Sequence, residues 1–163
     1  MTRFDVEITD HQSSLNIDPE RLNAAVREVL LSESVERCEV SVAVVDDATI
    51  HELNRQHLEH DYPTDVLSFT FQYDEGYVEG EVVVSADTAI RQAPEFGWSS
   101  NDELLLYVIH GMLHLTGYED NTPQAAARMR DGERRILSRL GVTPPDAESS
   151  LAREPLRKGE ISR

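Results

Sequence analysis

Apolar and polar residues alternate along short stretches of the chain, and this period of two is typical of strands with one buried face. The predicted strands cover residues 4–9, 39–45, 66–71 and 80–85. The last stretch, GEVVVS, is mostly apolar, so we expect that strand to be buried on both faces. The acidic residues 72–79 predict a mobile loop before it.

Apolar residues that recur every three or four positions predict helices between and after these strands. The helices cover residues 19–31, 48–57, 86–93 and 123–140, and a further one begins at Ser100 and ends before Gly117. Ser100 with Glu103 fits a capping box at the start of that helix, and Pro94 is expected to stop the helix before it.

The order of these elements predicts a single α+β domain with a small four-stranded sheet, packed with about five helices. Because helices connect most of the strands, most of the sheet should be parallel. A chain of 163 residues is long enough for one such domain, which we assign to residues 1–142. Residues 143–163 are polar without a regular pattern, so we expect a disordered C-terminal tail.

The charge of the chain narrows the classes of partner that it can bind. The formal net charge is −16 at pH 7 and Lys158 is the only lysine, so any contact with RNA must be local and based on arginine. No apolar run approaches the ~20 residues of a membrane span. Cys38 is the single cysteine, which excludes an internal disulfide and is consistent with a reducing cytoplasm.

Arginines form the densest positive cluster of the domain, on the outer face of the last predicted helix. We expect them to pair with nearby acids such as Asp131 and Glu133, with contact to RNA as the alternative. They are Arg128, Arg130, Arg134, Arg135 and Arg139.

The strongest chemical signal lies in the helix that begins at Ser100. His110 and His114 are one turn apart, so both imidazoles leave the same helix face, with Cβ atoms about 5–6 Å apart. Gly117 can end the helix in a left-handed conformation and turn the chain back, which brings Asp120 to the place of a third ligand. Two histidines and one carboxylate suit a zinc ion with an open position for water, the arrangement of catalytic zinc sites.

Two other interpretations of the histidines compete with a catalytic zinc site. Core histidines often bond a backbone carbonyl, but each buried ring needs two partners, and a lost partner costs about 1–3 kcal/mol. Zinc peptidases with an HExxH motif carry a glutamate base after the first histidine, whereas this chain has Gly111. A metallopeptidase is therefore the weaker alternative, and hydrolysis of a phosphodiester, which needs no side-chain base, is favoured.

Residues 110–120, HGMLHLTGYED, resemble the HGxLHLxGYDH signature of the YbeY endoribonucleases. Residues 63–69, PTDVLSF, are similar to the family's PTDVLSFPF segment, residues 80–85 to its GDIVIS strand, and Leu53–Asn54 to its LN pair. The resemblance covers residues 4–142. It implies a zinc-dependent endoribonuclease that prefers single strands and acts in the cytoplasm, in 16S rRNA 3′-end maturation and ribosome quality control. The implied partners are RNA and the small ribosomal subunit, without DNA or a membrane.

The resemblance also implies one zinc ion per chain, held by three residues of the signature. His110 and His114 match the family's ligands and would be the catalytic residues. The family's third ligand is a histidine, and Asp120 stands in its place. Aspartate is a common zinc ligand, so metal binding can survive the change. Glu119, which matches the family's aspartate, is the rival third ligand.

A second departure from the family concerns binding of the substrate phosphate. This chain has Leu58 where the family has an arginine. Arg55, His57 or His60 could supply the charge instead, unless they are ordinary solvated side chains, and Ser68 could face the cleft as a further substrate contact. The two departures leave two hypotheses open. The chain is an active nuclease in which other residues replace the family's third metal ligand and its arginine, or it is a weakened member that acts mainly as a binding factor for the small ribosomal subunit.

Overall fold

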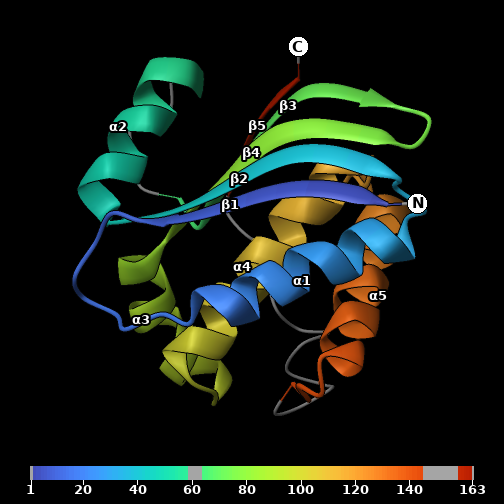
Figure 1. The fold of residues 1–163 in the computed structure, drawn as a ribbon. Coiled ribbons are helices and arrows are strands. Elements are labelled where there is room, and N and C mark those ends of the chain that lie inside the picture. The colour runs from blue at the N-terminus through green and yellow to red at the C-terminus, as the bar shows by residue number, and fades with distance from the viewer. Residues whose placement is uncertain (1, 59–63, 145–157, 163) are drawn as a thin grey trace.

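The computed structural model describes residues 2–58, 64–144 and 158–162 of the chain. The elements in chain order are β1 (Arg3–Asp10), α1 (Pro19–Ser32), β2 (Arg37–Val45), α2 (Asp47–Leu58), β3 (Val66–Asp74), β4 (Tyr77–Ser85), α3 (Ala86–Phe96), α4 (Ser100–Leu115), α5 (Pro123–Arg139) and β5 (Lys158–Ser162). One sheet runs through the molecule, with α1, α4 and α5 on one face and α2 on the other (Figure 1).

The strand order is β1-β2-β4-β3-β5, and β3 is antiparallel to β4 while the other neighbouring pairs are parallel. The predicted α+β fold with a mostly parallel sheet and five helices is confirmed in the described part of the chain. β1 to β4 are the four predicted strands. β5 is an additional strand in the tail 143–163, which we expected to be disordered, and it pairs with β3. Residues 145–157 and 163 lie outside the described residues.

The acidic stretch 72–79 is not the loop that its composition suggested. β3 and β4 extend into it and form a hairpin, which turns at Gly76 with a φ of +77°. Glycine takes this left-handed conformation without strain, which favours a turn at this point. Cross-strand pairing, such as that of Tyr73 with Val78, outweighs the acidity of the segment.

Two helix boundaries also differ from the predicted ones. α3 continues past Pro94 and ends at Phe96, and Gly97, which caps it, has a φ of +75°. Pro94 has no amide hydrogen to donate to the preceding turn, but the amides of Gly97 and Trp98 donate to the carbonyl oxygens of Pro94 and Ala93 and close the end of the helix. α4 is capped by Ser99 rather than Ser100, because the Ser99 side chain accepts a hydrogen bond from the amide of Asp102.

α4 is the central helix, buried from Glu103 to Leu115 between the sheet and the other helices of that face. It lies close to the sheet at Gly111, where a Cβ atom would be 2.5 Å from Cγ1 of Val82. The hydroxyl of Ser68 on β3 donates a hydrogen bond of 3.2 Å to the Gly111 carbonyl oxygen, so strand and helix are fixed to each other beside the histidines. Although α4 is apolar, no described helix combines the length and apolar character needed to cross a membrane.

Candidate metal centre

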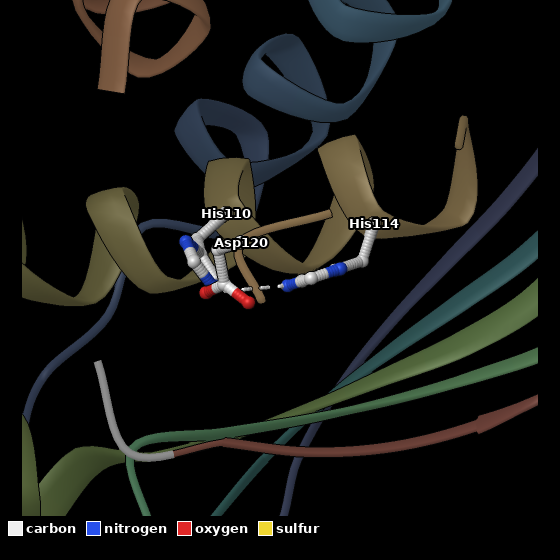
Figure 2. A group of neighbouring side chains, drawn as sticks. All are labelled: His110, His114 and Asp120. Carbon is white, nitrogen blue, oxygen red and sulfur yellow. Dashed lines mark ion pairs between the residues drawn. The ribbon is translucent and has the colours of Figure 1, made fainter. Parts of the chain in front are cut away.

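His110 and His114 project from the same side of α4 and are almost fully buried, with exposed fractions of 2% and 3%. Their ring centroids are 4.8 Å apart and the ring planes meet at 74°. The chain turns back after α4, so the Asp120 carboxylate lies beside both rings (Figure 2). Its Oδ2 atom is 3.8 Å from Nε2 of His110 and 3.9 Å from Nε2 of His114. The fold thus brings the three predicted ligands together.

The turn between α4 and Asp120 is held by its backbone conformation and by one aromatic side chain. Gly117 adopts a φ of +98°, as predicted for the residue that ends the helix. The Tyr118 hydroxyl donates a hydrogen bond of 3.3 Å to Glu33, which caps the end of α1, and accepts one of 3.1 Å from Arg135 on α5. The bond from Arg135 raises the pKa of that guanidinium above its usual value. Both neighbouring helices therefore hold the segment that carries Asp120.

The arrangement fits a divalent metal ion. Nε2 of His110 is buried and has no hydrogen-bond partner among the described residues, which costs free energy unless a ligand satisfies it. Two ligand atoms about 2.1 Å from a tetrahedral zinc ion lie roughly 3.4 Å apart. The separations of 3.8 and 3.9 Å from Oδ2 of Asp120 to the two imidazole nitrogens exceed that value by only about 0.5 Å. The ligand atoms of His110, His114 and Asp120 all lie within 4.8 Å of one another, so these residues could hold one ion.

Two positions next to these residues narrow the chemistry of the site. Glu119, the rival third ligand, is exposed and does not belong to the group of possible ligands in the described structure. A side chain at Gly111 would meet Val82 and Val66 of the sheet, at 2.5 and 3.2 Å from its Cβ atom. A glutamate base of the HExxH type therefore has no room at this position, which disfavours the metallopeptidase alternative.

Two of the predicted substrate contacts lie on α2 and do not join the ligand group. Arg55 is exposed and forms an ion pair with Glu52 of the same helix, with 2.5 Å between Nη2 and Oε1. His57 packs edge-on against Phe69, with ring centroids 5.5 Å apart. A role of Arg55 or His57 in binding substrate stays a prediction.

The other substrate predictions concern Ser68 and the position of the missing arginine. Ser68 is buried, and its hydroxyl bonds the backbone of α4, so the contact observed for it is structural. The side chain of Leu58 and the whole of His60 lie outside the described residues.

A residue that the sequence analysis assigned differently lies behind His110. Oε2 of Glu133 on α5 is 2.6 Å from Nδ1 of His110, the ring nitrogen that does not face Asp120. We had expected Glu133 to pair with an arginine. The helical spacing in the sequence could have shown that Glu133 faces the core. Glu133 follows Met129 by four positions and precedes Ile136 by three, and both of these residues are buried.

Arg134, Arg135 and Arg139 of α5 form ion pairs, as expected, but two of their partners lie at α1. Arg135 pairs with Glu33, the residue that caps the end of α1, at 3.4 Å, and Arg139 pairs with Glu28 of α1 at 3.3 Å. Arg134 pairs within α5. The cluster therefore ties α5 to α1, in addition to any contact that it could make with RNA.

Comparison with known proteins places the chain among relatives that share one name. A family model described as Endoribonuclease YbeY matches residues 7–141. Endoribonuclease YbeY of Rhodopirellula baltica is 46% identical over 115 residues, which cover 69% of this chain and 59% of that protein. The protein of the same name from Pelotomaculum thermopropionicum is 43% identical over 75% of this chain and 86% of its own length. That of Carboxydothermus hydrogenoformans is 39% identical, over 83% and 97%.

A solved structure shows the same likeness at the level of the fold. The solution structure of TM1509 from Thermotoga maritima superposes with a TM-score of 0.58 at 28% sequence identity, and covers 92% of this chain and 97% of that one. The match of the family model to residues 7–141 and the identity of 39–46% to relatives of one name agree with the signature around the two histidines. The chain therefore belongs to the YbeY endoribonuclease family.

Proposed function

We propose that this chain is a zinc-dependent endoribonuclease that prefers single-stranded RNA. The observation that carries the proposal is the convergence of His110, His114 and Asp120 on one small volume. The relatives, which are named endoribonucleases, give the reaction class. When bound, a zinc ion supplies Lewis-acid chemistry toward a phosphate oxygen or a water molecule.

The chain's own residues set the charge and the surroundings of the site. His110 and His114 bind a metal ion as neutral imidazoles, and Asp120 adds one negative charge, so a divalent ion keeps one net positive charge. That charge favours the anionic phosphodiester over neutral substrates. Three protein ligands leave a coordination position for substrate or solvent. Burial of both rings keeps bulk water away from them, which strengthens electrostatic interactions there.

We further propose that the substrate is ribosomal RNA. The family resemblance of residues 110–120 supports a role in 16S rRNA 3′-end maturation and ribosome quality control, in the cytoplasm and with the small ribosomal subunit as partner. The net charge of −16 sets a condition on this role. Recognition must depend on local contacts or on a protein partner, because general attraction to phosphate is weak in so acidic a chain.

The test of the proposal is metal content together with RNA cleavage by the purified chain. Elemental analysis should find about one zinc ion per wild-type chain, and chelation should stop cleavage of a single-stranded RNA oligomer. His114→Ala removes one ligand of the site. Because a bound Lewis acid is worth several kcal/mol of barrier, this variant should lose zinc and cleave roughly 100-fold more slowly, or worse.

The matched control for His114→Ala is His11→Ala. His11 is exposed on the segment that follows β1 and does not belong to the ligand group, so its loss should leave zinc content and cleavage unchanged. Cleavage by metal-free wild type, or by His114→Ala at the rate of loaded wild type, would contradict the proposal.

The alternative function is binding to the small ribosomal subunit with little catalysis, and the aspartate at position 120 favours it. Asp120→His, alone and with Leu58→Arg, restores the family's residues at the two altered positions. A large gain in cleavage in these variants would identify the natural chain as a weakened enzyme. Unchanged cleavage at a substantial wild-type rate would mean that Asp120 replaces the histidine fully.

A further inference from the structure

We propose that Glu133 is a positioning residue of the metal centre, which holds the His110 ring in the tautomer and orientation that direct Nε2 toward the ion. The inference rests on the proposed metal site and assigns a role to a residue outside the ligand group. Three observations carry it: the contact of Glu133 with His110, its place opposite Asp120, and the packing of α5 on α4.

The contact between Glu133 and His110 is short and nearly buried. Oε2 of Glu133 lies 2.6 Å from Nδ1 of His110. The two side chains are 13% and 3% exposed, so water competes little for either group. A carboxylate that accepts a hydrogen bond from a ring N–H at this distance forms a charge-assisted bond, roughly twice as strong as a neutral one. Glu133 therefore favours the tautomer that carries its proton on Nδ1.

The tautomer matters because histidine binds a metal ion through an unprotonated nitrogen. With the proton on Nδ1, the Nε2 lone pair of His110 is directed to the side where Asp120 lies at 3.8 Å. Nε2 has no hydrogen-bond partner among the described residues, as expected for an atom that awaits a ligand. A carboxylate behind a ligating histidine fixes the ring and raises its basicity. Because Glu133 bonds the other ring nitrogen, it is not a further ligand.

Close packing of α5 on α4 places Glu133 within reach of the ring. The neighbouring residue, Gly132, allows this approach: a Cβ atom there would lie 3.2 Å from Cδ1 of Leu113 and 3.2 Å from Cε2 of Tyr118. Any larger side chain would push the two helices apart or displace the aromatic ring that anchors the segment before Asp120.

The direction of Glu133 is fixed by its own helix. Met129 and Ile136 are buried one turn before and after it, so α5 presents Glu133 to the core side. α5 begins at Pro123, three residues after Asp120. The same short stretch of chain therefore delivers the third ligand and the residue that orients the first.

The test is the zinc affinity of Glu133 variants, measured by competition with a chromophoric chelator, beside the visible spectrum of the Co²⁺-loaded protein. Glu133→Ala removes the acceptor and should weaken zinc binding about 10–100-fold. Glu133→Gln keeps an acceptor without its charge and should give an intermediate loss. Asp131→Asn is the matched control, with the same change of charge on the same helix at a side chain that is 74% exposed. It should bind zinc like the wild type.

The Co²⁺ spectrum separates orientation of the ring from general stability, since it reports the geometry of the ligands. We expect both Glu133 variants to shift or weaken the visible bands and Asp131→Asn to leave them unchanged. Affinities and spectra in both Glu133 variants equal to those of Asp131→Asn would overturn the inference. If Glu133→Ala does not fold, Glu133→Gln decides by the same comparison. A wild type that binds neither ion would overturn the proposed metal site first, and this inference with it.

Discussion

Gly111 couples the packing of the histidine helix to the chemistry of its site. The absence of a side chain lets α4 approach β4 so closely that a Cβ atom would lie 2.5 Å from Cγ1 of Val82. This close approach fixes the helix that carries His110 and His114 next to Gly111. It also removes the position from which a peptidase presents its glutamate base. The same residue thus fixes the helix of the candidate ligands and leaves no room for a glutamate base beside them.

Gly111→Ala should destabilise the metal-free protein by about 1–2 kcal/mol in urea unfolding. Overpacking a filled core costs about 1–3 kcal/mol, and the better helix propensity of alanine returns at most about 1 kcal/mol. Val82→Ala removes the atom that the new methyl group would meet. The double variant should therefore lose less free energy of unfolding than the sum of the losses in the two single variants. Strictly additive losses would contradict the contact.

The grouping of His110, His114 and Asp120 could be predicted from the sequence because it depends on local geometry. All three lie within residues 110–120, where helix periodicity and one glycine determine which side chains meet. The contact of Glu133 with His110 is different in kind. It depends on how α5 packs on α4, and that packing is set by Gly132 and Leu113, which are far from each other in sequence.

At the scale of elements, one carboxylate joins the starts of α2 and α3. Asp47 accepts hydrogen bonds from the hydroxyls of Ser85 at 2.7 Å and Thr88 at 2.9 Å, and it forms an ion pair with Arg91. Its amide donates to the carboxylate of Asp87 at 2.9 Å. Burial opposes ionisation of Asp47, but the bonds from Ser85, Arg91 and Thr88 outweigh it and hold the pKa of Asp47 below its usual value.

Asp47→Asn should lower the free energy of unfolding by about 1–3 kcal/mol at pH 7, because buried hydroxyls and a guanidinium lose their charged acceptor. A carboxyl group whose pKa is lowered by folding stabilises the protein above its unfolded pKa of about 3.9, and this contribution is lost as the pH falls through the folded value. The difference between wild type and variant in urea unfolding should therefore shrink below about pH 4.

The control for Asp47→Asn is Glu52→Gln, which breaks an exposed pair with Arg55 and should leave the free energy of unfolding nearly unchanged. If the cost of Asp47→Asn stayed constant down to about pH 2, the ionised carboxylate would not be the source of the stability.

The predicted boundaries of helices agree with the structure where a local sequence signal determines them. α1 and α5 begin at Pro19 and Pro123, because the fixed φ of proline suits the first turn of a helix. Prediction failed where contacts between distant residues decide. The hairpin over residues 72–79 exists through pairing across two strands, which the acidic composition does not reveal. At the start of α4, Ser99 and Ser100 offer the same capping chemistry, so the sequence could not choose between them.

At the scale of the whole molecule, β5 shows a strand that pattern alone does not predict. Its sequence, KGEIS, contains a single large apolar residue and too short an alternation to stand out. It is a strand because the edge of β3 offers unpaired backbone groups that an extended segment can bond. The family model matches residues 7–141. β5 lies beyond that range, so a segment outside the family domain extends its sheet.

Because the whole chain is acidic, zinc content alone does not show where the metal is bound. The chain has 31 acidic against 15 basic residues, so carboxylates outside the site could also collect cations. A specific ion differs from these in one respect: it binds the folded state through groups that are brought together only by folding. It should therefore stabilise the whole domain, and only when both imidazoles are present.

Zinc should raise the melting temperature of the wild type and not that of His114→Ala. At a free zinc concentration about 100 times Kd, binding adds about 2.7 kcal/mol to the free energy of unfolding. For a chain of this size that gain corresponds to a rise of roughly 5–11 °C. His11→Ala should show the full rise, and Mg²⁺, a hard cation that imidazoles bind poorly, should give little. An equal rise in His114→Ala would assign the ion to surface carboxylates instead, because a site that has lost one of two buried imidazoles cannot retain its affinity.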